Sequence, residues 1–321
     1  MIMSQSIFKR HSNEPLLKPS DMPIEANAVF NPGAVEVGGE VILLLRIEDQ
    51  TGISQIRVAR SANGVDGWKI ADKPLLEPDL PQYPYEEWGC EDARVTQIRA
   101  NEWIIAYTAY SRYGPAVALA LTSDFEEAER LGIMLSPTNK DATVLPEKLR
   151  DSWFMLHRPV TGSEEDIWYA SSPTMVNWSQ PGILMAQRGG PWWDSVRIGV
   201  GGPPLKTDDG WLLIYHGVKK MGVDSLYRLG LAMLDKDDPR KVLLRASRWI
   251  FAPEAPFEMN GLLPNVVFTC GAIVRGDEVW MYYGAADTFV GLATAKLSEL
   301  VDFVKRHDFL CKIKPEKGMM R

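Results

Sequence analysis

The 321-residue chain has little cysteine, no long apolar run and no surplus of basic residues. Its three cysteines, Cys90, Cys270 and Cys311, are an odd number at spacings that match neither a zinc site nor a disulfide framework. A reducing compartment is therefore expected. The first residues lack an apolar core followed by a small-residue cleavage site, and no later run reaches transmembrane length. These absences predict a cytoplasmic protein with no membrane partner.

The formal net charge of -7 argues against a broadly basic surface. Because binding to nucleic acid needs clustered Lys and Arg that surplus carboxylates do not screen, nucleic acid is not an expected partner. A local basic pocket remains compatible with this balance. Hydrophobic residues make up 45% of the chain and Trp, Tyr and Phe together 10%, a composition typical of a protein with a sizeable buried core.

A short apolar run of β type follows a polar turn at five places along the chain. The runs are VILLLR from Val41, WIIAYT from Trp103, WFMLHR from Trp153, WLLIYH from Trp211 and VWMYYG from Val279. Their first residues are 62, 50, 58 and 68 positions apart, which is typical of propeller blades with loops of variable length. We therefore predict a single catalytic domain over residues 1–321, an all-β, five-bladed β-propeller.

Further strand candidates surround each central run. Upstream segments begin at Asn31, Asp92, Asp141, Ile198 and Asn265, and a third segment follows each run. A fourth segment recurs as KPLLEP, LGIMLSP, PGILMAQ and RWIFAPE, and its fifth copy, EPLLKP, stands before the first repeat at Glu14. A propeller closed by this N-terminal strand would have few exposed edges. A β-sandwich or two stacked β-domains stays the alternative.

The tail from Leu297 has helical spacing of Leu, Val and Phe, which predicts a short C-terminal helix packed across the ring.

Charged and polar residues occupy equivalent positions of the repeats. The fifth residue after the start of each central run is, in order, Arg46, Thr108, Arg158, His216 and Gly284. The upstream strands start on Asn31, Asp92, Lys140 with Asp141, Arg197 and Asn265. If both sets point toward one rim of the axis, they surround one pocket. Cations that converge with few carboxylates indicate an anion site, and a structural ion-pair network is the alternative.

Aromatic residues stand in the loops between the strand candidates, where sugar rings could stack on their faces. They are Trp88, Trp192, Trp193, Tyr83, Tyr85, Tyr110 and Tyr113. For the pair Trp192 and Trp193, sugar contact and a place at the core boundary are equally compatible with the pattern.

Six motifs carry a resemblance to a known family. They are GCEDARV (89–95), NKDATVLPEK (139–148), MLHRP (155–159), WWDSVRIGVGGPPLKTDDGWLLIYHGV (192–218), PNVVF (264–268) and YYGAADT (282–288). With these motifs the chain resembles glycoside hydrolase family 130, the β-mannoside phosphorylases and related β-mannosidases, from about Asn31 to about Val304. The resemblance implies a five-bladed propeller that cleaves a β-mannosidic bond with inorganic phosphate as co-substrate. It implies inversion to α-mannose 1-phosphate, and neither a metal nor an organic cofactor.

The resemblance also implies roles for single residues. Asp92 in GCEDARV looks like the catalytic acid that protonates the glycosidic oxygen by relay through a sugar hydroxyl. A phosphate-binding set is implied at Lys140, Arg158, Arg197, His216 and Tyr227, and a group that holds the mannose at the cleaved linkage at Asn31, Arg46, Arg94 and Asp287. Ala93 departs from the family pattern, in which many members have Pro, and leaves the φ angle there unfixed.

Three functions are compatible with these residues. An inverting phosphorylase fits best, because phosphate is already nucleophilic and needs only cationic positioning, whereas an inverting hydrolase needs a second carboxylate to activate water. In a β-mannosidase on the same fold, Glu91 or Glu48 would be the base, although strand alternation would point Glu91 away from the Asp92 side. A non-catalytic carbohydrate-binding propeller is the third. β-1,4-linked and β-1,2-linked mannosides and mannosyl-glucose are all compatible with the motifs. The sequence leaves open whether the chain forms a homo-oligomer.

Overall fold

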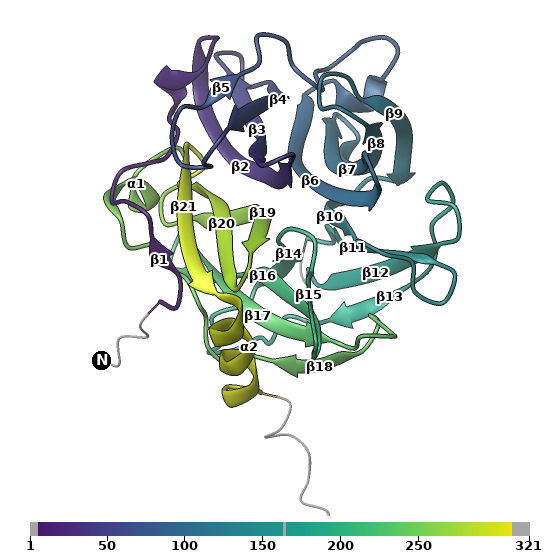
Figure 1. Cartoon of the computed structure of the whole chain (residues 1–321), viewed down its shortest axis with the longest axis vertical. Helices are drawn as coiled ribbons and strands as arrows, with labels where there is room; N and C mark the ends of the chain where they lie inside the picture. Colours follow the sequence, from purple (N-terminus) through teal and green to yellow (C-terminus); the bar gives the residue numbers. More distant parts are fainter. Residues whose placement is uncertain (1–5, 163–164, 310–321) are drawn as a thin grey trace, which may run out of the picture.

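The computed structural model describes residues 6–162 and 165–309, which form an all-β structure with few helical residues. In this part of the chain no helix has the length and apolar character needed to cross a membrane. Cys90 and Cys270 are buried free thiols, and Cys311 lies outside the described residues. The strands form four sheets (Figure 1), none of which closes on itself within the described ranges.

All five predicted central runs are strands, each paired with the strand before it. The central strands are β3 (Glu40–Asp49), β7 (Glu102–Ser111), β11 (Trp153–Pro159), β16 (Gly210–Met221) and β20 (Glu278–Ala285). The strands before them are β2 (Ala26–Val37), β6 (Gly89–Arg99), β10 (Asn139–Val144), β14 (Arg197–Val200) and β19 (Val267–Arg275). In the fourth group Pro203 and Pro204 interrupt the pairing, because proline has no N–H to donate, and the strand resumes as β15 (Leu205–Thr207).

Third and fourth strands complete each group. The third strands are β4 (Ser54–Ser61), β8 (Gly114–Thr122), β12 (Ile167–Ser172), β17 (Asp224–Leu234) and β21 (Phe289–Lys296). The outer strands are β5 (Lys69–Ile70), β9 (Glu129–Leu135), β13 (Ser179–Met185) and β18 (Val242–Arg245). The predicted outer segments at Lys73 and Arg248 contribute only isolated bridges at Leu76 and Phe251, and both segments contain prolines, which interrupt a ladder.

The N-terminal segment borders the last group of strands, as predicted. Strand β1 (Lys9–Arg10) pairs with β21, and Leu17 makes an isolated bridge to Val290. The regular strand therefore lies a few residues earlier than the predicted segment at Glu14. The first and second groups share one sheet through a single parallel pair, Ser54 with Gly89.

Hydrophobic clusters fill the space between consecutive groups. Alternation along β3 sends Ile42 and Leu44 to a cluster shared with the second group, and Leu43 and Leu45 to a cluster shared with the fifth. Three further clusters join the second to the third, the third to the fourth and the fourth to the fifth group. Each group is thus packed on both faces, and the first strands of the groups meet near the centre of the molecule (Figure 1).

The predicted C-terminal helix is present as α2 (Leu297–Arg306). Its buried face, with Leu300, Phe303 and Val304, packs in the cluster between the fourth and fifth groups and contacts β17, β18 and β21. The other helical segments are short: α1 (Pro256–Met259), and the 3-10 turns η1 (Pro19–Asp21) and η2 (Pro84–Glu86).

Candidate active site

A pocket of about 420 Å³ lies where the first strands of the five groups meet. Every group contributes polar side chains to it. These are Asn31 and Arg46 from the first group, Glu91 and Asp92 from the second, Lys140, Asp141, Arg158 and Glu165 from the third, Arg197, His216 and Tyr227 from the fourth, and Asp287 from the fifth. The wall also contains Phe30, Tyr110, Pro115, Val160, Val266 and Phe268.

Bulges in the first strands turn the polar residues toward the pocket. The register of β2, β6 and β10 shifts next to Asn31, Asp92 and Asp141, and these three residues have positive φ angles of 47°, 50° and 52°. Asn and Asp adopt this conformation more readily than most residues. A bulge re-aims side chains and breaks strict alternation. The prediction that Glu91 points away from the Asp92 side was therefore wrong: both residues line the pocket.

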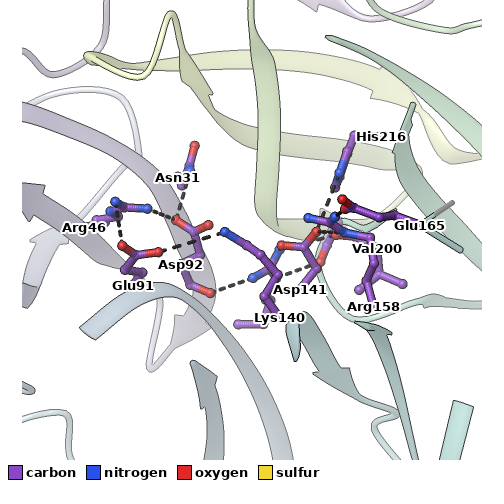
Figure 2. A network of polar contacts seen from close by, with 12 residues as sticks. Asn31, Arg46, Glu91, Asp92, Lys140, Asp141, Arg158, Glu165, Val200 and His216 are labelled. Carbon is purple, nitrogen blue, oxygen red and sulfur yellow. Dashed lines mark hydrogen bonds and ion pairs between the residues drawn. The ribbon is translucent and has the colours of Figure 1, made fainter. Parts of the chain in front are cut away.

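Asp92 is almost fully buried and held by two donors on one oxygen (Figure 2). Its Oδ1 accepts hydrogen bonds from Asn31 Nδ2 at 2.9 Å and from Arg46 at 3.0 Å. Burial opposes ionisation, but the charges of Arg46, Lys140 and Arg94 outweigh it and hold the pKa of this carboxyl below its usual range. Arg46 also binds Glu91 at 3.0 Å, so it fixes both carboxylates of β6.

Asp141 is the centre of a second network on the facing side of the pocket (Figure 2). Its carboxylate accepts a hydrogen bond from Arg158 Nε at 2.8 Å and one from Arg94 at 3.4 Å. Although Asp141 is fully buried, these two guanidinium groups hold its pKa well below the usual range. Arg158 also forms an ion pair with Glu165, so its guanidinium is shared by two carboxylates.

His216 lies beside this network as a neutral imidazole. Its Nε2 is 3.6 Å from Asp141 Oδ2. Burial lowers the pKa of His216 to about 3, against the opposing charge of Asp141. Its Nδ1 is buried and has no hydrogen-bond partner among the described residues, which is uncommon for a buried polar atom and is typical of a group that meets a ligand.

Arg197 and Tyr227 form the part of the pocket that no carboxylate neutralises among the described residues. Arg197 donates a hydrogen bond to the Tyr227 hydroxyl and lies over its ring, with the guanidinium carbon 5.4 Å from the ring centroid. The neighbouring cation Lys140 keeps its Nζ 4.0 Å from Glu91 Oε2, at the outer limit of an ion pair. These two cations are therefore available to an incoming anion.

Asp287 differs from the other carboxyls of the pocket. Burial raises its pKa to about 6, with Arg46 opposing the shift and Asp92 adding to it.

The pocket contains more carboxylates than the sequence predicted. Glu91, Asp92, Asp141, Glu165 and Asp287 face four full cations, which are Arg46, Lys140, Arg158 and Arg197. The expectation of cations with few carboxylates was therefore wrong. The pocket combines the two alternatives of the sequence analysis, because an ion-pair network fixes its walls while Arg197 and Lys140 stay open to an anion.

Nine of the ten predicted site residues line this pocket: Asp92, Lys140, Arg158, Arg197, His216, Tyr227, Asn31, Arg46 and Asp287. Arg94 does not. It is 1% exposed and lies behind the wall, where it donates to the backbone carbonyls of Asp92 and Gly201 and to Asp141. These contacts make it a positioning residue for the Asp141 carboxylate and for the backbone at Asp92, and they do not support the predicted sugar contact.

Asp141 and Glu165 were not among the predicted site residues. Asp141 could have been found, because it stands at the position of the third repeat that Asp92 occupies in the second. Glu165 had no such signal: it reaches the pocket through an isolated parallel bridge to Arg197 of the next group. Within the described ranges, no group of three or more His, Cys, Asp or Glu residues has the arrangement of a metal site.

The predicted aromatic residues separate into two sets. Tyr110 lines the pocket, whereas Trp193 is buried against Tyr215 and Trp192 packs on Phe309. The pair Trp192 and Trp193 therefore belongs to the core boundary and not to the pocket wall.

Known proteins resemble this chain over nearly its whole length. Residues 6–306 match the model of the family Glyco_hydro_130, described as β-1,4-mannooligosaccharide phosphorylase. A β-1,2-mannobiose phosphorylase of Thermoanaerobacter sp. is 38% identical over 88% of this chain and 95% of its own length. A β-1,4-mannooligosaccharide phosphorylase of Ruminococcus albus is 28% identical over 94% of this chain and 92% of its own length.

A solved structure shares the fold. The β-1,2-mannobiose phosphorylase of Listeria innocua, in complex with β-1,2-mannobiose, superimposes with a TM-score of 0.86 at 34% identity and covers 93% of this chain and 99% of its own. With the family model matched over almost the full chain, and relatives above 30% identity over most of their length, the chain belongs to glycoside hydrolase family 130.

Proposed function

We propose that this chain is an inverting phosphorylase of β-1,2-linked mannosides, with Asp92 as the catalytic acid and Arg197, Tyr227 and Lys140 as the principal phosphate ligands. The observation that carries the proposal is the division of the pocket. One side presents a buried carboxyl held by Asn31 and Arg46, and the other presents a cation, Arg197, whose partner among the described residues is the neutral Tyr227 hydroxyl.

For the fold we propose a single domain that is a five-bladed β-propeller. The proposal is supported by five groups of antiparallel strands, by a hydrophobic cluster between each pair of consecutive groups including the last and the first, and by the pairing of β1 with β21. The pocket would then lie at the propeller axis. Location in the cytoplasm and assembly into a homo-oligomer stay predictions.

The sugar to be transferred would be held by Asn31, Arg46 and Asp287. Asp92 supplies a proton to the glycosidic oxygen, through a sugar hydroxyl, as the bond from that oxygen to the anomeric carbon breaks. Asp92 must be protonated before it can act as an acid. The positive charges of Arg46, Lys140 and Arg94 disfavour its protonated form. Bound phosphate offsets those charges and the sugar excludes water, and both effects raise the pKa of the carboxyl. Phosphate binding and acid function are coupled in this way.

Phosphate would attack the anomeric carbon from the side of Arg197, Tyr227 and His216. Its oxygens accept hydrogen bonds from Arg197, from Lys140 and from an N–H of the neutral His216 imidazole. The new bond joins a phosphate oxygen to the anomeric carbon, and the product is α-mannose 1-phosphate. Fixed donors stabilise the charge of the attacking group without reorganising.

A hydrolase is disfavoured by the state of the available bases. Glu91 is bound by Arg46 and lies near Lys140, and Glu48 does not line the pocket. An inverting hydrolase needs a carboxylate free to activate water on the face opposite the acid. A purely binding function is disfavoured by membership in a family of enzymes.

The names of the relatives support a β-1,2 linkage. Those with 35–38% identity are named as phosphorylases of β-1,2-mannobiose or β-1,2-oligomannan, whereas the relatives named for β-1,4 linkages are 28% identical. We therefore propose β-1,2-linked manno-oligosaccharides as substrates.

Incubation with β-1,2-mannobiose, with and without phosphate, tests the function. We expect α-mannose 1-phosphate, identified by NMR, only when phosphate is present, and slower turnover of β-1,4-mannobiose. The Asp92→Asn variant should lose about 10²- to 10⁴-fold in kcat, the range for loss of a general acid. Asp209→Asn, in an exposed ion pair with Lys305, is the matched control and should behave as wild type. Release of free mannose at equal rates without phosphate would refute the proposal.

A further inference from the structure

The three exposed aromatic side chains of the described residues all lie in one place. They are Tyr85, Trp88 and Tyr113, which are 40%, 43% and 61% exposed, while the remaining Phe, Trp and Tyr side chains in these ranges are buried or partly buried. Exposed aromatic rings are costly to leave in water without a use, so their gathering marks a binding surface.

Two segments that pair with each other carry these rings. Residues 85–88 precede β6, and residues 110–113 comprise the last two residues of β7 and the turn that follows, so that the β6–β7 pairing continues between the two segments. The backbone N–H of Trp88 donates a hydrogen bond to the backbone carbonyl of Tyr110 at 2.8 Å, and Arg112 binds the Glu87 carboxylate. We name these two segments, 85–88 and 110–113, the aromatic ribbon.

The ribbon is continuous with the pocket. Tyr110 lines the pocket wall, and the Trp88 ring meets the Tyr110 ring edge to face with centroids 5.3 Å apart. Farther along, the rings of Tyr85 and Tyr113 lie 5.7 Å apart. Neither Trp88 nor Tyr85 nor Tyr113 lines the pocket, so these rings can contact only the part of a ligand that extends beyond it.

A buried ion pair holds the ribbon in shape. Glu86 is 3% exposed and accepts hydrogen bonds from the Tyr107 hydroxyl at 2.6 Å and from Arg130 at 3.1 Å. These contacts of Glu86 anchor η2 to β7 and β9. Tyr85 and Trp88, on either side of Glu86 in the sequence, stay exposed. A surface that is rigid before binding loses little conformational entropy when a ligand arrives.

We propose that the aromatic ribbon binds the third and later sugars of a manno-oligosaccharide, on the leaving-group side of the cleaved bond, and so makes the enzyme prefer oligosaccharides to the disaccharide. This inference rests on the proposed function. Asp92 reaches the glycosidic oxygen through one sugar hydroxyl, so the cleaved bond lies close to Asp92 and the leaving-group sugar lies next to β6 and β7. A chain that continues from that sugar leaves the pocket past Tyr110 and reaches Trp88 first. The C–H faces of sugar rings stack on aromatic rings. The hydroxyl groups at the edges of the sugar would then hydrogen-bond to neighbouring polar side chains such as Glu87 and Arg112.

The double variant Tyr85→Ala/Tyr113→Ala tests the inference. We expect kcat/KM for β-1,2-mannotriose and mannotetraose to fall about five- to tenfold, roughly one kinetic decade for the loss of ring stacking. We expect kcat/KM for β-1,2-mannobiose to stay within about twofold of wild type, because the disaccharide has no third sugar to contact the ribbon. The matched control is Val176→Ala/Ile183→Ala, which removes two exposed apolar side chains of the third group and should change neither value.

Calorimetric binding of mannotriose and mannobiose, measured without phosphate, makes the inference independent of turnover. Weaker binding of the trisaccharide alone by the double variant supports the ribbon even if no mannose 1-phosphate is ever formed, which would refute only the proposed function. An equal loss for both sugars, or no loss, overturns the inference. A changed mass in light scattering with unchanged sugar selectivity also overturns it, because the ribbon would then be a contact between copies of the chain.

Discussion

Arg158 divides its guanidinium between Asp141 and Glu165, and the two carboxylates have different surroundings. Asp141 is also bound by Arg94 and flanked by His216, so it belongs to the fixed wall of the pocket. Glu165 has Arg158 as its ion-pair partner and its side chain is 12% exposed. An anion that approached Arg158 would therefore compete with Glu165 more readily than with Asp141, and we propose that this carboxylate sets how tightly phosphate binds.

The variant Glu165→Gln is expected to lower the KM for phosphate about three- to tenfold with little change in kcat, because a negative charge next to the phosphate site is lost. Phosphate titration at saturating mannobiose measures it. The control Glu147→Gln, in an exposed ion pair with Lys206, should leave this KM unchanged. A higher KM in the Glu165 variant would mean that the carboxylate orients Arg158 for phosphate instead of competing with it.

At the scale of the strands, the site depends on bulges and on glycines that leave room for them. Asn31, Asp92 and Asp141 occupy bulges of three first strands. In the fifth group, Gly284 of the central strand lies against Asn31 and has no side chain. In the fourth group, the planar ring of His216 lies beside Asp141. A Cβ on Gly284 would lie 2.0 Å from Asn31 Oδ1 and 2.7 Å from its backbone nitrogen.

Gly284→Ala should therefore reduce activity by moving Asn31 away from Asp92. We expect kcat to fall by more than about tenfold, as for a displaced catalytic group, and the free energy of unfolding to fall by about 1–3 kcal/mol through overpacking. Gly276→Ala is the control, because this turn glycine has a positive φ of 62° and nothing within 4 Å. It should lose stability through its backbone angle and keep its kcat. Wild-type kcat in Gly284→Ala would show that Asn31 does not position Asp92.

At the scale of the whole molecule, the N-terminal segment is tied to the last group by one buried carboxylate. Glu258 of α1 is fully buried and accepts hydrogen bonds from Arg10 of β1 at 2.8 Å and from the Tyr283 hydroxyl of β20 at 2.7 Å. Arg10 also lies over the Phe251 ring, with 4.3 Å between the guanidinium carbon and the ring centroid. The same guanidinium binds Glu254 at the surface.

This arrangement gives a matched pair of stability variants. Glu258→Gln leaves Arg10 without its buried partner and should lower the free energy of unfolding by about 3–5 kcal/mol. Glu254→Gln removes a partner whose side chain is 57% exposed and should cost less than about 1 kcal/mol. Urea unfolding followed by tryptophan fluorescence measures both. Equal, small effects would show that the N-terminal segment contributes little to the stability of the whole.

The sequence by itself determined the strand groups, because short continuous apolar runs recur after polar turns and a strand of this kind buries both of its faces. Equivalent positions of the repeats predicted seven of the nine site residues that line the pocket, and the resemblance to the family added Tyr227 and Asp287. The motif GCEDARV pointed to Asp92, and the tail from Leu297 to a helix.

Tertiary structure alone decided the electrostatics of that pocket. A bulge, which depends on two strands being paired, turned Glu91 inward, and a bridge between neighbouring groups brought Glu165 to Arg158. Burial made His216 neutral and raised the pKa of Asp287 to about 6. These properties depend on distances between residues far apart in the chain and on the water that folding removes. Neither quantity can be derived from the order of the residues alone.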